Sequence, residues 1–241
     1  MFRGQRVLGI IPARGGSKRL PRKNIRVLNK KPMIAWTIDV ANRTQILDRV
    51  VISTEDQEIA SVAELWGGEG TVVSRPRSLS ADNSSTAEVI VELLTSLGLG
   101  GETFGYVTLL QPTSPLRTVK HLNEAFDTIT QRNAVGAISV CKTEHPVEWM
   151  GKLDSSKLLD SFFQSTQLDK QSQKFGPSYQ INGAIYIVPV DQFLKQRTLF
   201  LSNGMVAYLM DRKDSVDIDN EYDLYLAESL ISAREEQQSL I

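Results

Sequence analysis

The sequence has little from which a disulfide, a zinc centre or a membrane anchor could be built. Of its 241 residues, one is cysteine and two are histidine. A single cysteine cannot form an internal disulfide, and Cys141 lies within an apolar run, so we expect it in the core. Zinc sites draw on clusters of Cys and His, so this composition argues against one. No apolar stretch approaches the roughly 18 residues that a bilayer-spanning helix needs.

Net charge is also nearly absent. The 27 basic and 28 acidic residues leave a formal charge of −1, which argues against binding to nucleic acid or an anionic membrane through overall charge. The amino-terminal residues lead into a run of only about five apolar residues, which is too short for a signal peptide. These absences predict a cytoplasmic protein. The length and the apolar share of 41% are typical of one large domain, residues 1–241.

Short apolar runs alternate with helical patterns along the chain. The continuous run from Tyr106 to Leu110 is typical of a strand that is buried on both faces of a parallel sheet. A helix is indicated where apolar residues recur at i, i+3, i+4 and i+7, as they do at Leu122, Ala125, Phe126 and Ile129. The alternation predicts an α/β domain with a doubly wound, mostly parallel sheet.

The alternation breaks between about residues 143 and 178. That stretch is polar, but interspersed aromatic residues such as Phe162 favour a small inserted subdomain over a flexible loop. Beyond it the alternation resumes and ends in a helix that carries Tyr222 and Tyr225. We expect the polar tail after Arg234 to fray.

Positive charge gathers at the amino terminus. The first 31 residues contain ten Lys or Arg, and the first carboxylate is Asp39. Most of these cations lie in or just after the loop that follows the first predicted strand, where open parallel sheets bind ligands. Gly15 and Gly16 let backbone N–H groups of that loop approach a ligand closely. The loop therefore suits a polyphosphate, although a solvated basic face or a basic patch for RNA would show the same composition.

The loop sequence itself is more specific. Residues 11–24, IPARGGSKRLPRKN, match neither the dinucleotide fingerprint nor the Walker loop. They closely resemble the opening signature of the acylneuraminate cytidylyltransferases, which make CMP-activated sialic, legionaminic and pseudaminic acids. The resemblance spans roughly residues 6–230, because further motifs follow in family order. These are Ser74 to Pro76, Asp82 to Thr86, Leu110 to Arg117, Asn182 to Tyr186 and Val216 to Asp219.

The resemblance implies transfer of CMP from CTP to the anomeric hydroxyl of a nonulosonic acid, with release of pyrophosphate. It implies that Arg14, Lys18 and Lys23 bind the phosphates and that Arg14 and Lys23 take part in catalysis. Such cations would stabilise the charge that develops as pyrophosphate leaves. The remaining nucleotide contacts would be Asn24 to the ribose, and Arg75 with Ser85 or Thr86 to the cytosine.

On the sugar side, the resemblance implies contacts from Gln111, Thr113, Ser114 and Asn182. Many members carry an arginine suited to the sugar carboxylate where this chain has Ser172, and some carry a lysine where it has Glu148. We therefore expect Lys170 or Lys174 to take part of that role. The family also implies a homodimer, with the subdomain at about 143–178 projecting into the partner chain.

A pair of carboxylates indicates a metal. Asp217 and Asp219 are two residues apart, so on an extended segment both point the same way while Ile218 points into the core. Two hard oxygen ligands suit Mg²⁺ when phosphate and water complete its octahedron. The alternative is that Asp219 or Asn220 caps the final helix.

Two other functions remain open at this point. One is a cytidylyltransferase for an eight-carbon ulosonic acid, although those relatives typically read RLPGKP where this chain reads RLPRKNI. The other is a non-catalytic protein that binds nucleotides or RNA through the basic loop. The paired aspartates argue against the second, because a module that only binds polyanions has no use for carboxylates opposite its cations.

Overall fold

A computed structural model describes residues 1–81, 84–164 and 175–239 of the protein. Within these ranges, seven strands form one sheet in the order β5-β4-β1-β6-β8-β7-β9. Their bounds are β1 (Val7–Pro12), β4 (Arg49–Thr54), β5 (Val72–Ser74), β6 (Tyr106–Leu109), β7 (Gly136–Lys142), β8 (Tyr179–Pro189) and β9 (Met205–Met210). A small antiparallel pair, β2 (Val27–Leu28) and β3 (Lys31–Pro32), stands apart.

The sheet is mostly parallel, as the sequence predicts. Strand β1 pairs in parallel with β4 on one side and with β6 on the other, and β4 continues in parallel to β5. Only β8 runs against its neighbours, because it returns from the segment after β7 and pairs antiparallel to both β6 and β7. The carboxyl ends of β1, β4, β5 and β6 therefore meet at one edge of the sheet, which is where such folds bind ligands.

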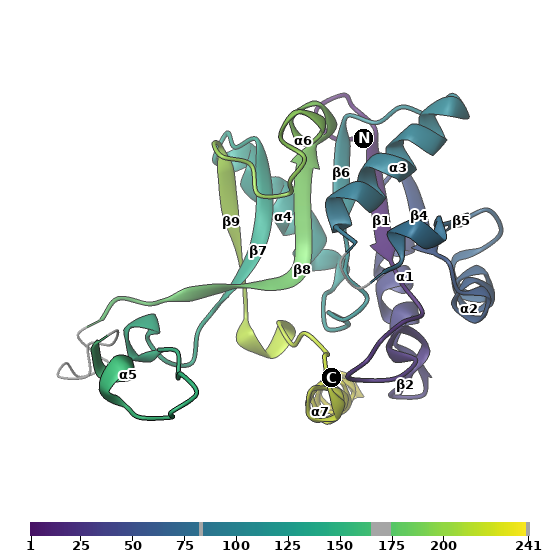
Figure 1. The fold of residues 1–241 in the computed structure, drawn as a ribbon. Coiled ribbons are helices and arrows are strands. Elements are labelled where there is room, and N and C mark those ends of the chain that lie inside the picture. The colour runs from purple at the N-terminus through teal and green to yellow at the C-terminus, as the bar shows by residue number, and fades with distance from the viewer. Residues whose placement is uncertain (82–83, 165–174, 240–241) are drawn as a thin grey trace.

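Helices cover both faces of the sheet (Figure 1). Apolar residues of α1, α2 and α4 pack in the core on one face, and those of α3 and α6 pack on the other. The helices are α1 (Met33–Arg43), α2 (Gln57–Gly67), α3 (Thr86–Leu99), α4 (Val119–Gln131), α5 (Asp160–Gln164), α6 (Val190–Gln196) and α7 (Glu221–Ser239). Short 3-10 turns are η1 (Lys23–Ile25), η2 (Arg77–Leu79), η3 (Val147–Trp149) and η5 (Arg212–Asp214). The α/β architecture is confirmed.

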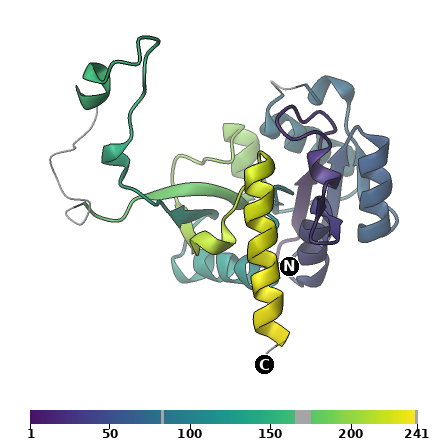
Figure 2. The same cartoon turned by 90° about the horizontal axis from the view of Figure 1, so that it is seen from below.

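The segment between β7 and β8 leaves this body. Figures 1 and 2 show η3 and α5 carried away from the sheet on an extended arm, to which the first residues of β8 belong. The departure agrees with the break in alternation at about 143–178. Since the arm covers no face of the sheet, it adds nothing to the central core.

One expectation for the carboxyl-terminal helix is wrong. Helix α7 continues to Ser239 instead of fraying after Arg234. Its packing face is formed by Leu224, Ala227 and Ile231, which join the cluster around Ile218, whereas Tyr222 is 74% exposed. The expected helix itself is confirmed, and it carries Tyr222 and Tyr225.

Cys141 is buried, as expected. Among the helices that the structure describes, none is long and apolar enough to cross a membrane.

Candidate active site

A cleft of about 330 Å³ opens at the carboxyl edge of the parallel strands. Six segments of the described chain line it: the loop after β1, the start of η1, the residues after β5, the first turns of α3, the residues after β6, and the stretch before α7. Its polar and charged wall consists of Arg14, Lys23, Asn24, Arg75, Ser84, Thr86, Gln111, Thr113, Asp217 and Asp219. The structure thus brings most of the predicted site residues together from across the sequence.

The cationic loop is held by carboxylates from the neighbouring β4–α2 connection. The N–H of Gly15 donates a hydrogen bond of 2.8 Å to Glu55 Oε1. Arg22, in the left-handed conformation at φ 57°, donates to Asp56 Oδ2 at 2.6 Å. A Cβ on Gly15 would lie 2.4 Å from an Asp56 side-chain oxygen, so a larger residue fits there only if the loop or the Asp56 side chain shifts. These contacts fix the backbone from which Arg14 projects.

Lys23 and Asn24 begin the η1 turn and face the cleft together. Asn24 is buried and donates from Nδ2 to the carbonyl oxygen of Arg14 at 2.9 Å, which closes the loop on itself. Lys23 donates from Nζ to Asp219 Oδ1 at 2.9 Å. Lys18 behaves differently: it is exposed on the same loop and is not among the residues that line the cleft.

The two aspartates face the cleft as their spacing predicts. Both line it, while Ile218 between them is fully buried. Burial raises the pKa of Asp217, and the nearby charge of Asp219 adds to the rise, against a hydrogen bond from Thr113. The hydrogen bond from Lys23 lowers the pKa of Asp219, helped by Arg19 at 2.7 Å. Both carboxylates therefore belong to one electrostatic unit with Lys23.

Asn220, and not Asp219, caps the amino terminus of α7. Asn220 Oδ1 accepts from the N–H of Asp223 at 3.1 Å, and Asp223 Oδ2 accepts from the N–H of Asp219 at 2.9 Å. The carboxylate of Asp219 is left to the cleft. Since no group of three or more His, Cys, Asp or Glu side chains gathers anywhere in the described part of the chain, a metal here would need substrate and water oxygens beside this pair.

Arg75 forms the buried end of the cleft. It is 6% exposed, and it donates from Nη2 to the carbonyl oxygen of Ser53 at 2.8 Å and from Nε to Ser53 Oγ at 3.1 Å. Desolvation lowers its pKa. Of the two hydroxyls that the sequence left open, Thr86 lines the cleft, whereas the Ser85 hydroxyl accepts from the N–H of Ala87 and caps α3.

Gln111 and Thr113 form the wall after β6. The carbonyl oxygen of Thr113 accepts from the N–H of Ile218 at 2.8 Å, which joins this wall to the aspartate segment. Gly183, at φ 76°, comes so close that an added Cβ would lie 2.4 Å from Gln111 Oε1. Gly183 of β8 therefore packs directly against the Gln111 side chain.

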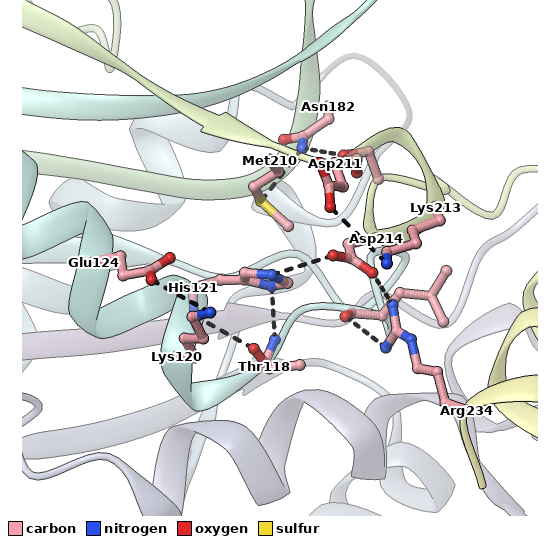
Figure 3. A network of polar contacts seen from close by, with 12 residues as sticks. Thr118, Lys120, His121, Glu124, Asn182, Met210, Asp211, Lys213, Asp214 and Arg234 are labelled. Atoms are coloured by element: carbon pink, nitrogen blue, oxygen red, sulfur yellow. Dashed lines mark hydrogen bonds and ion pairs between the residues drawn. The ribbon is translucent and has the colours of Figure 1, made fainter. Parts of the chain in front are cut away.

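Asn182 and Ser114 do not reach the cleft. Asn182 is 3% exposed; its Oδ1 accepts from Ser139 Oγ at 2.6 Å and its Nδ2 donates to Ser215 Oγ at 2.9 Å. Ser114 is fully buried. Figure 3 shows the Asn182 side chain close to Met210. In this structure both residues hold the wall together and do not line the cleft, and their contact with the sugar stays a prediction.

Arg117, the last residue of the motif that begins at Leu110, supports this wall from inside the protein. Its guanidinium is fully buried, which lowers its pKa to about 9. It donates from Nη1 to the carbonyl oxygen of Ala184 at 2.6 Å and from Nη2 to Thr37 Oγ1 at 2.8 Å. Its place directly after a Pro-bounded turn beside a buried strand was the available signal. Lys170 and Lys174 lie outside the described residues, as does Ser172.

Comparison with known proteins places these features in a family. The family described as cytidylyltransferase matches residues 8–239. The chain is 33% identical over 236 residues to the N-acylneuraminate cytidylyltransferase of Escherichia coli, an alignment that covers 97% of this chain and 54% of that protein. It is 32% identical over 233 residues to the CMP-N,N'-diacetyllegionaminic acid synthase of Legionella pneumophila, with 96% and 98% covered. The chain therefore spans about half of the first relative and nearly all of the second.

A third relative and two solved structures agree. The pseudaminic acid cytidylyltransferase of Campylobacter jejuni is 31% identical over 229 residues, with 95% of this chain and 97% of that protein covered. The structure titled CMP:2-keto-3-deoxy-manno-octonic acid synthetase complexed with CTP matches with a TM-score of 0.71 at 16% identity, over 95% of this chain and 99% of that one. A 4-diphosphocytidyl-2C-methyl-D-erythritol synthase matches with a TM-score of 0.65 at 12% identity, over 94% and 99%. At these identities the two structures show a shared fold.

Proposed function

This chain belongs to the cytidylyltransferase family, and on that premise we propose that it transfers CMP from CTP to the anomeric hydroxyl of a sialic-acid-type nonulosonic acid and releases pyrophosphate. The cleft carries the proposal, because it sets Arg14, Lys23 and Arg75 beside the carboxylates of Asp217 and Asp219. The cations suit a triphosphate. The carboxylates would serve no purpose in a site that only binds a polyanion.

Magnesium fits this donor set. Asp217 and Asp219 would hold it, since both line the cleft and their spacing turns two hard oxygen ligands to one side. Desolvation raises the pKa of Asp217, and a divalent cation in the cleft would stabilise its charged form. When bound, Mg²⁺ supplies charge neutralisation at the triphosphate.

The cations of the loop and of η1 would bind the phosphates. Arg14 lines the cleft from a backbone fixed at Gly15, and Lys23 lines it too. When CTP arrives, Lys23 would exchange part of its contact with Asp219 for a phosphate oxygen and stabilise the charge on the leaving pyrophosphate. Lys18 would meet the triphosphate from the exposed side of the loop, and Asn24 would lie near the ribose.

The cytosine and the sugar would occupy opposite parts of the cleft. Arg75 is buried and fixed by Ser53, so it presents donors at a defined place, with Thr86 as the neighbouring hydroxyl. Gln111 and Thr113 would contact the sugar. Lys170 or Lys174 remains our proposal for the sugar carboxylate, and substituting both with Ala should raise the KM for the sugar alone.

The projecting arm favours a homodimer. Large apolar side chains on it are about half exposed or more, which a lone chain would leave in water. They are Val147, Met150, Leu153, Leu158, Leu159 and Phe163. We propose that a second copy covers them and that the arm reaches the partner's cleft, so that a dimer-breaking substitution should raise the KM for the sugar.

A labelled substrate tests the proposed reaction. A nonulosonic acid that carries heavy oxygen in its anomeric hydroxyl would be incubated with CTP and Mg²⁺, and the product analysed by mass spectrometry. If the anomeric hydroxyl attacks the α-phosphate, the CMP-sugar keeps the label in the bridging oxygen. A product that has lost the label would overturn this mechanism.

A further inference from the structure

A second cavity lies away from the cleft, between α1, the amino terminus of α4 and α7. Its volume is about 440 Å³. Within the described ranges it shares no lining residue with the cleft. It is called the α1–α4–α7 pocket below. Nothing in the proposed reaction uses it.

Cations dominate this pocket. Five basic side chains line it against two carboxylates, Asp39 and Glu235. The basic residues are Lys31, Arg43, Arg117, Lys120 and Arg234. The pocket also lies at the start of α4, where the first turn of a helix has N–H groups without an intrahelical acceptor and carries partial positive charge. The excess of positive charge predicts an anionic occupant.

At the inner wall of the pocket, one nitrogen of the Arg117 guanidinium lacks a hydrogen-bond acceptor. Its two terminal nitrogens donate to protein oxygens, but its buried Nε has no hydrogen-bond partner. A buried donor left unpaired costs free energy, and native proteins leave few of them. Arg117 also lines the pocket, so an anion bound there would lie beside this positive charge.

Arg234 is a second fixed cation. It donates to the carbonyl oxygen of Leu116 at 3.0 Å and forms an ion pair with Asp214, which also contacts His121 Nε2 at 3.3 Å (Figure 3). These contacts hold its guanidinium in place before any ligand arrives, which lowers the entropic cost of binding. Figure 3 also shows Thr118 and Lys120 on the adjoining first turn of α4.

Two more basic side chains lie at the rim of the pocket. Arg43 and Lys120 are exposed, and Arg43 has no hydrogen bond or ion pair within the described residues. Lys120 has only a surface contact of 3.7 Å with Glu124. Trp36, Val40 and Ile231 form the apolar part of the lining and leave room for an organic group. We propose that the α1–α4–α7 pocket is a second anion site that binds the phosphate group of a small molecule.

The test measures phosphate binding and needs no turnover, so its failure is distinct from a failure of the proposed reaction. Inorganic phosphate would be titrated into an Arg14→Gln/Lys23→Gln background, which weakens binding in the cleft, and followed by phosphorus NMR. We expect phosphate still to bind. Adding Arg43→Gln and Lys120→Gln should weaken it at least about tenfold, because two charge-assisted contacts are lost.

A matched control removes the same charge elsewhere. Arg132 and Lys195 are exposed and lie outside the lining of the pocket, so Arg132→Gln/Lys195→Gln in the same background should leave binding unchanged. A parallel titration with AMP, read by tryptophan fluorescence, distinguishes a free phosphate from a nucleotide: tighter binding of AMP means that the apolar lining takes part. Absence of phosphate binding in the background, or equal binding in the pocket and control variants, overturns the proposal.

Discussion

Replacing Asn182 with Ala distinguishes a buried support from a substrate contact. The side chain accepts from Ser139 and from the N–H of Ala184, and it donates to Ser215, so the substitution removes three hydrogen bonds to oxygen or nitrogen at a site that is 3% exposed, besides a weaker one to Met210 Sδ. At roughly 1 kcal/mol per net hydrogen bond, the loss is about 3 kcal/mol. For a domain of this size each kcal/mol shifts the thermal midpoint by about 2–4 °C, so we expect a fall of about 6–12 °C.

The assay is thermal unfolding by circular dichroism, with Asn203→Ala as the control. Asn203 is exposed, and its side chain makes one long contact with Ser202 at 3.4 Å, so its replacement should change stability by less than about 0.5 kcal/mol. The reasoning would be refuted if both variants melted together with the wild type while Asn182→Ala alone raised the KM for the sugar. That result would place the amide in the cleft.

Three further substitutions or comparisons test the cleft. Asp219→Asn should lower kcat by about 10²-fold or more with little change in thermal midpoint. Excess EDTA should abolish the activity of the wild type. Full turnover in EDTA would show that the reaction needs no metal ion. Gly15→Ala should raise the KM for CTP, because its Cβ would lie 2.4 Å from an Asp56 oxygen and displace the loop; an unchanged KM would show that the loop is not fixed there. The wild type should prefer CTP over UTP by at least about tenfold in kcat/KM, and Arg75→Gln should reduce that ratio. Equal turnover of both nucleotides by the wild type would mean that Arg75 and Thr86 do not recognise the base.

Local patterns predicted the elements of the fold well. Strand β6 lies within the apolar run from Tyr106 to Leu110 that predicted it, and α4 buries the four residues whose spacing predicted it. Period-2 spacing likewise predicted that Asp217 and Asp219 share a side, because strand geometry alone sets that direction. Such features depend on a few consecutive residues.

Features that depend on distant contacts could not be predicted. A polar side chain before a strand can face either solvent or the core, and Asn182 faces the core because Ser139 and Ser215 meet it there. An arginine is usually found at the surface. Arg75 is buried against Ser53 because β4 packs beside β5, which the sequence alone does not show. The choice between Ser85 and Thr86 depended on which residue begins α3, and helix boundaries are uncertain by a residue or two from sequence.

Pyrophosphate release tests the central claim most directly. Initial rates would be measured with CTP and Mg²⁺ alone, and then with a sialic, a legionaminic, a pseudaminic or an eight-carbon ulosonic acid added. We predict release that depends on at least one of the nine-carbon acids and matches the CMP-sugar formed, with little release from CTP alone. Release that is equal with and without every nine-carbon acid, or that responds only to the eight-carbon acid, would contradict the proposed function.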